Sequence, residues 1–466
     1  MDTRRTRIPD FFFYMWLLLL AWAPLPAASN WPWALALLTG LISFLLVILL
    51  GYALVKKILL LSSLQVFRWP VILLLVIPLW SSLQLLQLPL DVLELFSPVA
   101  ADTYARAGLS SGRITLDLAR TQMLAAFSWA LWGFFCLSLL LLDSHKRIER
   151  TCFFLVCCGV FQALYGSFMT LSGLEYGFFL EKEAYRGVAT GTFINRNHLA
   201  GYLEMCLAIG IGLLVSSLNR DSHVSWRNRV RNLLDALLGE KIRLRVFLAL
   251  MVIALVLTHS RMGNTAFFSS LLICGALWML FEKKFHKGAI ILFVSLVLID
   301  TLIVGQWFGF EEVVQRLENT SADSESRDEV VADGLIMLND FWLTGSGLGS
   351  FGNAFPKYQK NTVTGYLSYY DHAHNDYLEF FVELGIVGML ALILLVGLTL
   401  YKSLIAMFKR RDRLARGIAF ASTMGMIALL IHSAVDFNLQ MPANALLFIV
   451  ILALGWISGS LKHREH

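Results

Sequence analysis

The chain has 466 residues, of which 57% are hydrophobic and 15% are charged, with a net charge of +5. A soluble globular domain has roughly 45–50% apolar and about 25% charged residues, so the composition excludes a soluble enzyme, a disordered tail and a secreted disulfide scaffold. It indicates a polytopic membrane protein. All six cysteines lie in apolar runs, which predicts neither disulfides nor a cysteine metal site.

The N-terminus has three arginines between residues 4 and 7, followed by an apolar run over residues 11–28. This pattern resembles a signal peptide, and Ala-Ala-Ser at 27–29 resembles a cleavage site. A second apolar run begins at Trp31, however, which favours a helical hairpin that stays in the protein.

A helix that spans a bilayer needs about 20 mostly apolar residues. By this criterion the sequence predicts an all-α polytopic membrane protein with about 12 transmembrane helices, near 11–28, 31–54, 69–88, 119–142, 151–172, 198–216, 246–260, 263–281, 288–306, 378–404, 415–435 and 442–460. Most of the 38 Lys and Arg residues lie in alternate connecting segments, and the positive-inside rule then puts both termini in the cytoplasm. We expect residues 1–466 to form a single integral membrane domain.

Three connections on the predicted outer side are long: 89–118, 173–197 and 306–375. The last is a large periplasmic loop between spans 9 and 10, too long to serve only as a link, and we expect it to contain short helices. The basic segments 217–245 and 405–414 are explained as topology anchors beside anionic lipid. Long loops on a rigid helical frame often carry function, so the chemistry is expected outside.

A run of polar residues precedes the predicted sixth span. It comprises Arg186, Asn195, Arg196, Asn197 and His198, with Glu204 two turns further along. An asparagine cap and snorkelling arginines would explain one or two of these residues. They do not explain the whole run, which favours a role in ligand binding.

Arg261 lies in the very short turn between the predicted seventh and eighth spans. A charged group at this depth is costly and usually faces a polar cavity or a partner. A snorkelling side chain is the structural alternative, and a ligand-binding role is favoured.

The large outer loop contains a predicted amphipathic helix over residues 324–339, with Arg327 in its first turn. Apolar residues recur there near helical spacing: Val330, Val331, Leu335 and Leu338. A glycine-rich segment follows at 345–352, which is compatible both with phosphate binding and with a hinge.

The segment 371–379 has the sequence Asp-His-Ala-His-Asn-Asp-Tyr-Leu-Glu. Its histidines and acids suggest a metal site, but a helix would place His372 and Asp376 on one face and His374 on another. We therefore expect no metal, and favour a histidine that accepts a proton or orients a ligand.

Taken together, these motifs resemble the O-antigen ligase and O-antigen polymerase superfamily of bacterial envelope polysaccharide glycosyltransferases. The resemblance covers about residues 185–390. It is carried by the asparagine-rich segment before span six, Ser260-Arg261, the block from Arg327 through Trp342 to Gly349, and His374-Asn375-Asp376-Tyr377-Leu378 followed by Glu383-Leu384-Gly385.

The resemblance implies a GT-C-like enzyme of the bacterial inner membrane whose active site faces the periplasm. It implies transfer of a glycan from undecaprenyl diphosphate, without a metal or other cofactor. In a ligase the acceptor is lipid A–core, and in a polymerase it is a second lipid-linked glycan. Relatives that glycosylate protein usually carry a further soluble C-terminal domain.

The same resemblance suggests roles for individual residues. Arg261 and Arg196 would hold the departing diphosphate, with Arg186 as a third arginine, because guanidinium donates bidentate hydrogen bonds to phosphate. His374 would take the proton of the acceptor hydroxyl, which attacks the anomeric carbon with inversion. Further substrate or histidine contacts would come from Asn195, Asn197, His198, Arg327, Asn375, Asp376 and Glu383.

Three alternatives remain open at this level. A glycolipid transporter or flippase usually has polar residues at the membrane midplane and an internal repeat, and the sequence shows neither clearly. A peptidoglycan polymerase fits the motifs less well. Ligase and polymerase share the donor and the membrane face, so the sequence gives only a slight preference for a ligase.

Overall fold

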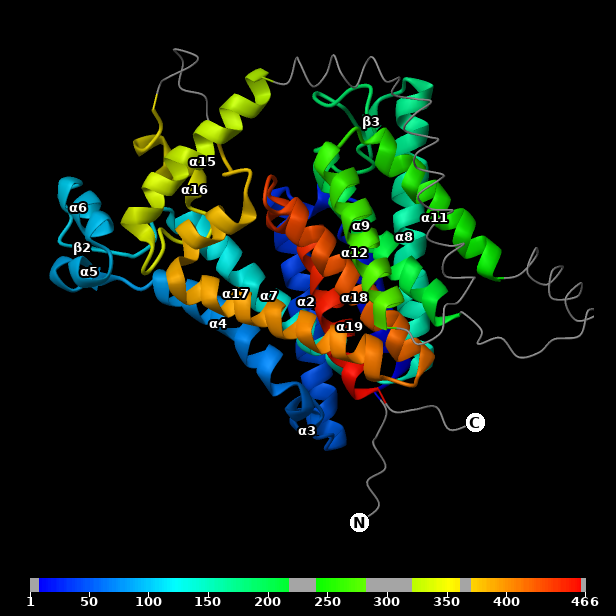
Figure 1. The fold of residues 1–466 in the computed structure, drawn as a ribbon. Helices are drawn as coiled ribbons and strands as arrows, with labels where there is room; N and C mark the ends of the chain where they lie inside the picture. The colour runs from blue at the N-terminus through cyan, green and yellow to red at the C-terminus, as the bar shows by residue number, and fades with distance from the viewer. Residues whose placement is uncertain (1–7, 218–239, 282–320, 361–369, 462–466) are drawn as a thin grey trace, which may run out of the picture.

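The computed structural model describes residues 8–217, 240–281, 321–360 and 370–461 (Figure 1). Its α-helices are α1 (Asp10–Trp22), α2 (Pro32–Lys56), α3 (Leu60–Leu64), α4 (Arg68–Gln84), α5 (Leu90–Phe96), α6 (Pro98–Arg106), α7 (Leu118–Leu141), α8 (His145–Ser172), α9 (Arg196–Ser216), α11 (Glu240–Leu257), α12 (Arg261–Phe281), α15 (Ser321–Phe341), α16 (Phe351–Ala354), α17 (Asp376–Lys409), α18 (Arg413–His432) and α19 (Pro442–Ser460). The strands are β1 (Leu88–Pro89), β2 (Ser111–Gly112), β3 (Tyr176–Gly177) and β4 (Leu180–Glu181), which pair as β1–β2 and β3–β4, both antiparallel. Short 3₁₀ turns cover Ala27–Ser29, Gln65–Phe67, Phe355–Lys357 and Asn438–Gln440.

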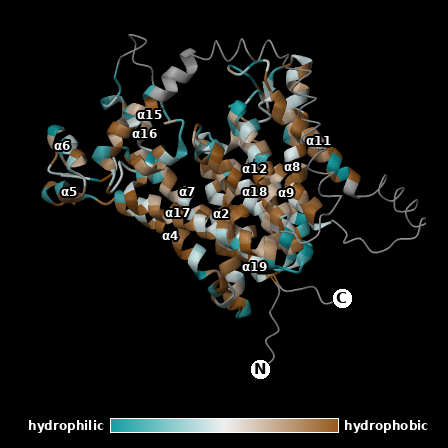
Figure 2. Ribbon diagram, in the orientation of Figure 1, coloured by the Kyte–Doolittle hydropathy of each residue, from teal (hydrophilic) through white to brown (hydrophobic). Residues whose placement is uncertain are grey.

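The predicted all-α membrane architecture is confirmed. Within the described residues, nine helical segments are long and apolar enough to cross a membrane, and each corresponds to a predicted span: Pro32–Lys56, Leu60–Gln84, Leu118–Leu141, His145–Ser172, Arg196–Ser216, Arg261–Leu280, Asp376–Lys409, Arg413–His432 and Pro442–Ser460. Figure 2 shows hydrophobic residues along these helices and hydrophilic residues mainly at their ends and in the connections.

Three further spans were predicted. Two of them correspond to helices that do not meet the criteria for crossing a membrane, and the third cannot be compared with the structure. The span predicted at 11–28 is a shorter helix, α1, which ends at Trp22 because Pro24 and Pro26 follow. The span predicted at 246–260 is helical, as α11, but its first turns carry charged residues. The span predicted at 288–306 lies outside the described residues.

Helix α9 forms the centre of the bundle. It packs against α8, α11, α12, α18 and α19 and is buried along nearly its whole length. The closest approach is to α18, where a Cβ on Gly212 would lie 2.5 Å from the carbonyl oxygen of Gly417, and a Cβ on Gly417 would be equally close to Gly212. Small residues at such positions let membrane helices approach backbone to backbone.

A second group of helices, α4, α7 and α17, packs beside this centre. Helix α17 is interrupted at Gly385, whose φ of 62° and ψ of −167° are not helical. The glycine-rich segment lies in this break: the amide of Gly347 donates to the carbonyl of Glu383, and a Cβ on Gly345 would lie 2.1 Å from the same oxygen. The glycines are therefore required for close packing against α17.

Residues 321–360, which belong to the loop predicted at 306–375, form a separate layer on the end of the bundle (Figure 1). The predicted helix at 324–339 is confirmed as α15, which packs against α17. Its buried face contains Val330, Met337 and Phe341, whereas Leu335, expected on the apolar face, is 52% exposed. Val331 and Leu338 pack partly buried against the same cluster as Val330, so the spacing indicated the buried face correctly except at Leu335.

Candidate functional site

Four parts of the chain meet at one end of the bundle. They are the start of α9, the start of α12, residues 371–375 before α17 (the histidine segment) and residues 433–441 between α18 and α19 (the α18–α19 turn). We call this the site end. Helix α19 runs away from it, and α1 begins at the opposite end, where Asp10 pairs with Arg147 at the start of α8.

The histidine segment is not helical, whereas the sequence analysis had assigned His372, His374 and Asp376 to faces of a helix. Asn375 caps α17 by accepting from the amide of Leu378, so His372 and His374 both precede the helix. His374 has a φ of 50°, in the left-handed region that non-glycine residues rarely occupy. Both imidazoles contact the ring of Phe437, at centroid distances of 4.2 Å for His372 and 4.9 Å for His374.

His372 is paired with a carboxylate that the sequence analysis did not single out. Its Nδ1 lies 2.6 Å from Oε1 of Glu379, whose Oε2 accepts from the amide of Ala373 at 2.8 Å. Burial alone would lower the pKa of His372, but Glu379, with smaller contributions from Asp371 and Glu383, raises it to about 9. His372 is therefore charged at neutral pH.

Asp376 connects the histidine segment to the α18–α19 turn. Its side chain is 1% exposed, and Oδ2 accepts from the hydroxyl of Ser433 at 2.7 Å and from the amide of Leu439 at 3.1 Å. Its backbone amide donates to the carbonyls of Ser433 and Asp436. Oδ1 has no hydrogen-bond partner among the described residues.

The polar run at the start of α9 divides into caps and site contacts. Asn195 is the N-cap of α9 and accepts from the amide of Asn197. Asn195 therefore has the capping role that the sequence analysis gave as the alternative to ligand binding. The side chain of Asn197 donates to Asp436, and Nε2 of His198 lies 3.7 Å from the same carboxylate. Burial would raise the pKa of Asp436, but the neighbouring His198 and His432 lower it, so Asp436 is an anion.

The predicted arginines differ in their surroundings. Arg261 is the first residue of α12 and is exposed at the site end. Arg196 lies 5.7 Å from the ring centre of Tyr185, and its buried Nε has no hydrogen-bond partner in the described part of the chain. Arg186 is on the surface, where it pairs with Glu181 at 2.7 Å. Arg327 lies in α15, and its side chain is outside what the structure describes.

Glu383 lies beside the break in α17 at Gly385. Its Oε1 accepts from the amide of Phe351 at the start of α16 at 3.0 Å. Gln84 of α4 donates to the backbone oxygens of Glu383 and Thr344. These contacts hold the glycine-rich segment in place.

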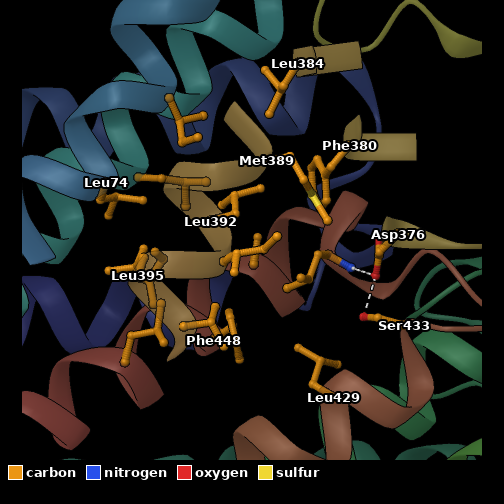
Figure 3. Close-up of a pocket in the computed structure, with 18 of the residues that line it drawn as sticks. Leu74, Asp376, Phe380, Leu384, Met389, Leu392, Leu395, Leu429, Ser433 and Phe448 are labelled. Atoms are coloured by element: carbon orange, nitrogen blue, oxygen red, sulfur yellow. Dashed lines mark hydrogen bonds between the residues drawn. The ribbon is translucent and has the colours of Figure 1, made fainter. Parts of the chain in front are cut away.

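An apolar pocket with a volume of about 380 Å³ opens beside Asp376 (Figure 3). Helices α4, α7, α17, α18 and α19 line it, with side chains that include Leu74, Leu392, Leu395, Leu429 and Phe448. Asp376 is the single charged residue among those that line it, and together with Ser433 it lies at one end (Figure 3). On the unbroken part of α17 the lining runs from Met389 to Leu400, about 16 Å at 1.5 Å per residue.

The α18–α19 turn was missed by the sequence analysis. It contributes Asp436 and Phe437 to the site, and Asn438 packs against Gly201 of α9. Polar residues in a short turn directly after an apolar run were also the signal that identified Arg261. His432, Ser433 and Asp436 likewise follow an apolar run directly, so the same pattern could have identified this turn as part of the site.

The described residues contain no group of three His, Cys, Asp or Glu side chains arranged to hold a metal ion. His372 and Asp376, which were weighed as metal ligands, instead bind Glu379 and Ser433.

Comparison with known proteins identifies one part of the chain. Residues 246–393 match the family described as O-antigen ligase, and no curated protein matches the chain. The matched region contains Arg261, the histidine segment and Glu383, but neither the start of α9 nor the α18–α19 turn. This match confirms the resemblance of the chain to the O-antigen ligase and polymerase superfamily.

Proposed function

We propose that this protein transfers a glycan from undecaprenyl diphosphate to an acceptor hydroxyl, and that it is an O-antigen ligase whose acceptor is lipid A–core. The proposal extends the family assignment, which supports a glycosyltransferase-like membrane enzyme acting on lipid-linked glycans. We propose further that the site end faces the periplasm of a bacterial inner membrane, with both termini in the cytoplasm.

The observation that carries the proposal is the continuity between the apolar pocket and the histidine segment. Asp376 connects the two, since it lines the pocket and directly follows Asn375, the last residue of the histidine segment. A volume of about 380 Å³ is within the roughly 300–1,000 Å³ usual for ligand sites. A lipid chain in this pocket would bring its polar head to the histidines, as a lipid-linked donor requires.

The charges at the site end suit the departure of diphosphate. Outside the cytoplasm no ATP is available, so the energy for transfer must already reside in the sugar–diphosphate bond. As the acceptor oxygen bonds to the anomeric carbon, the bond to the diphosphate oxygen breaks and its electron pair leaves with the diphosphate. Arg261 and Arg196 would stabilise that charge, with Arg186 as a third candidate.

The two histidines of the segment suit different tasks. His372 is already protonated at neutral pH through its pairing with Glu379, so it would supply positive charge and would be a poor base. His374 remains the proposed base, taking the hydroxyl proton of the acceptor. Asn375 and Asp376 would fix the position of His374, and Asn197 and His198 would add substrate contacts from the start of α9.

Deletion of the gene followed by glycolipid analysis tests the proposal. For a ligase, lipid A–core should lack long glycan while the undecaprenyl-linked polymer accumulates. Cores that carry a single repeat would indicate a polymerase, and loss of the lipid-linked glycan from the periplasmic face would indicate a flippase. Complementation with the wild-type protein and with His374→Ala separates loss of catalysis from loss of the protein.

A further inference from the structure

The α18–α19 turn and the histidine segment are joined by several hydrogen bonds. The amide of Asp376 donates to carbonyls of the turn, and its carboxylate accepts from Ser433 and Leu439. The side chain of Asn375 donates to the carbonyl of Ala434 at 2.9 Å. Two segments about sixty residues apart in the chain therefore form one unit, and the turn lies outside the matched ligase domain.

Phe437 is at the centre of this unit. Its ring stacks on His372, with 4.2 Å between centroids and 15° between planes. The edges of His374 and His198 meet the same ring at 4.9 Å and 4.6 Å, with interplanar angles of 77° and 76°. A single phenyl group thus contacts three imidazoles that belong to two different helix starts.

We propose that Phe437 is a positioning residue that fixes His372, His374 and His198 relative to one another in the active site. That these histidines belong to an active site rests on the proposed function. The left-handed backbone of His374 is a conformation that its surroundings must stabilise, and the Phe437 ring supplies one of those contacts.

Asp436 supports the same arrangement from the side of α9. Its Oδ1 accepts from the amide of Phe437 at 2.8 Å and lies 3.7 Å from Nε2 of His198. Its other oxygen accepts from Asn197. The turn therefore holds both the phenyl ring and the histidine that meets its edge.

The stacked geometry has a consequence for the charge on His372. A cation over an aromatic face is stabilised by the ring quadrupole, so Phe437 favours protonated His372. The other groups that act on His372 are Asp371 in its own segment, Glu379 and Glu383 of α17, and His198 of α9. Replacing Phe437 leaves the three carboxylates in place, and among these groups His198 is the one whose ring contact with Phe437 is removed.

The test compares Phe437→Leu, Phe437→Tyr and Phe134→Leu in the full-length protein. Phe134 is a matched control, because it is fully buried and stacks on Trp16 at 5.5 Å within the helix bundle. In transfer from undecaprenyl-diphosphate-linked glycan, Phe437→Leu should lower kcat about 10²-fold, as expected for misplaced catalytic groups, with little change in KM for the donor. Phe437→Tyr should retain most of the activity.

A second readout does not depend on catalysis. NMR titration of ¹⁵N-histidine-labelled protein should show that His372 loses its proton at lower pH in Phe437→Leu than in the wild type. A wild-type kcat and titration in Phe437→Leu would overturn the inference, and so would an equal kcat loss with a changed titration in Phe134→Leu. If the wild type transfers no glycan, the proposed function fails, and the titration still decides whether Phe437 positions the histidines.

Discussion

Glu204 of α9 and His432 of α18 form a hydrogen bond of 2.8 Å between Oε1 and Nδ1, and both side chains are completely buried. Helix α12 packs against the same carboxylate, since a Cβ on Gly263 would lie 3.2 Å from Oε1. Ionisable residues within membrane helices are costly and usually pair with one another. This pair joins three helices just below the site end.

The pair should stabilise the fold only while both members are present. His432→Leu should lower the free energy of unfolding by about 3–5 kcal/mol, because Glu204 is left buried and unpaired. The double variant Glu204→Leu/His432→Leu should recover most of this loss. Thermal unfolding of the detergent-solubilised protein provides the measurement, and a double variant as unstable as the single one would show that the pair is not the cause.

Replacing Arg261 and replacing His374 should affect different steps of the reaction. Arg261→Ala should weaken binding of the lipid diphosphate, and Arg261→Lys, which lacks the planar fork, should lower the rate about 10²–10³-fold. His374→Ala should bind the donor normally and transfer it about 10²–10⁴-fold more slowly. Donor binding and single-turnover transfer separate the two effects, with surface Arg106→Ala as the control. Near-normal transfer by His374→Ala would leave His198 or Asp376 as the better candidate base.

Activity should depend on pH through His372. Its pKa is raised to about 9 by Glu379, so the stabilisation from their pairing is fully present below about pH 6.5 and is lost as the pH rises through about 9. Glu379→Gln removes the charge partner, and the alkaline limb of the kcat profile should move to lower pH. Exposed Asp102→Asn should leave the profile unchanged. An unaltered alkaline limb in Glu379→Gln would contradict the assignment.

Labelling can test the orientation of the chain in the membrane. Lys357 is exposed at the site end, and Arg411 is exposed between α17 and α18 at the opposite end. An impermeant thiol reagent should label Lys357→Cys in cells with a permeable outer membrane, whereas Arg411→Cys should react only after the inner membrane is opened. The native protein serves as the background control. The reverse pattern would put the site in the cytoplasm and remove the proposal of a periplasmic donor.

Chelation tests the expectation that transfer needs no metal. Activity on purified undecaprenyl-diphosphate-linked glycan should survive EDTA, because His372 and Asp376 already bind other protein groups. Loss of activity that a divalent ion restores would return His372, His374 and Asp376 as candidate metal ligands.

The spans and several cap residues were predictable because they depend on local sequence. Helix length follows from runs of apolar residues, and Asn195 and Asn375 cap the helices that begin directly after them. The motifs at Arg261 and at 374–378 identified the family for the same reason, since each is contiguous. The apolar spacing also indicated the buried face of α15, where Val330, Val331 and Leu338 pack, and it was wrong at Leu335, which is exposed.

The tertiary structure alone decided which distant residues form the site. Phe437 contacts His198 and His372, and Asp436 binds Asn197, yet more than two hundred residues separate the turn from α9. Hydrophobic periodicity specifies a helix without specifying its neighbours, so no local pattern indicates that these segments meet. Their meeting depends on backbone contact between α9 and α18 at Gly212 and Gly417 and on the break in α17 at Gly385, both of which arise only when the whole bundle is packed.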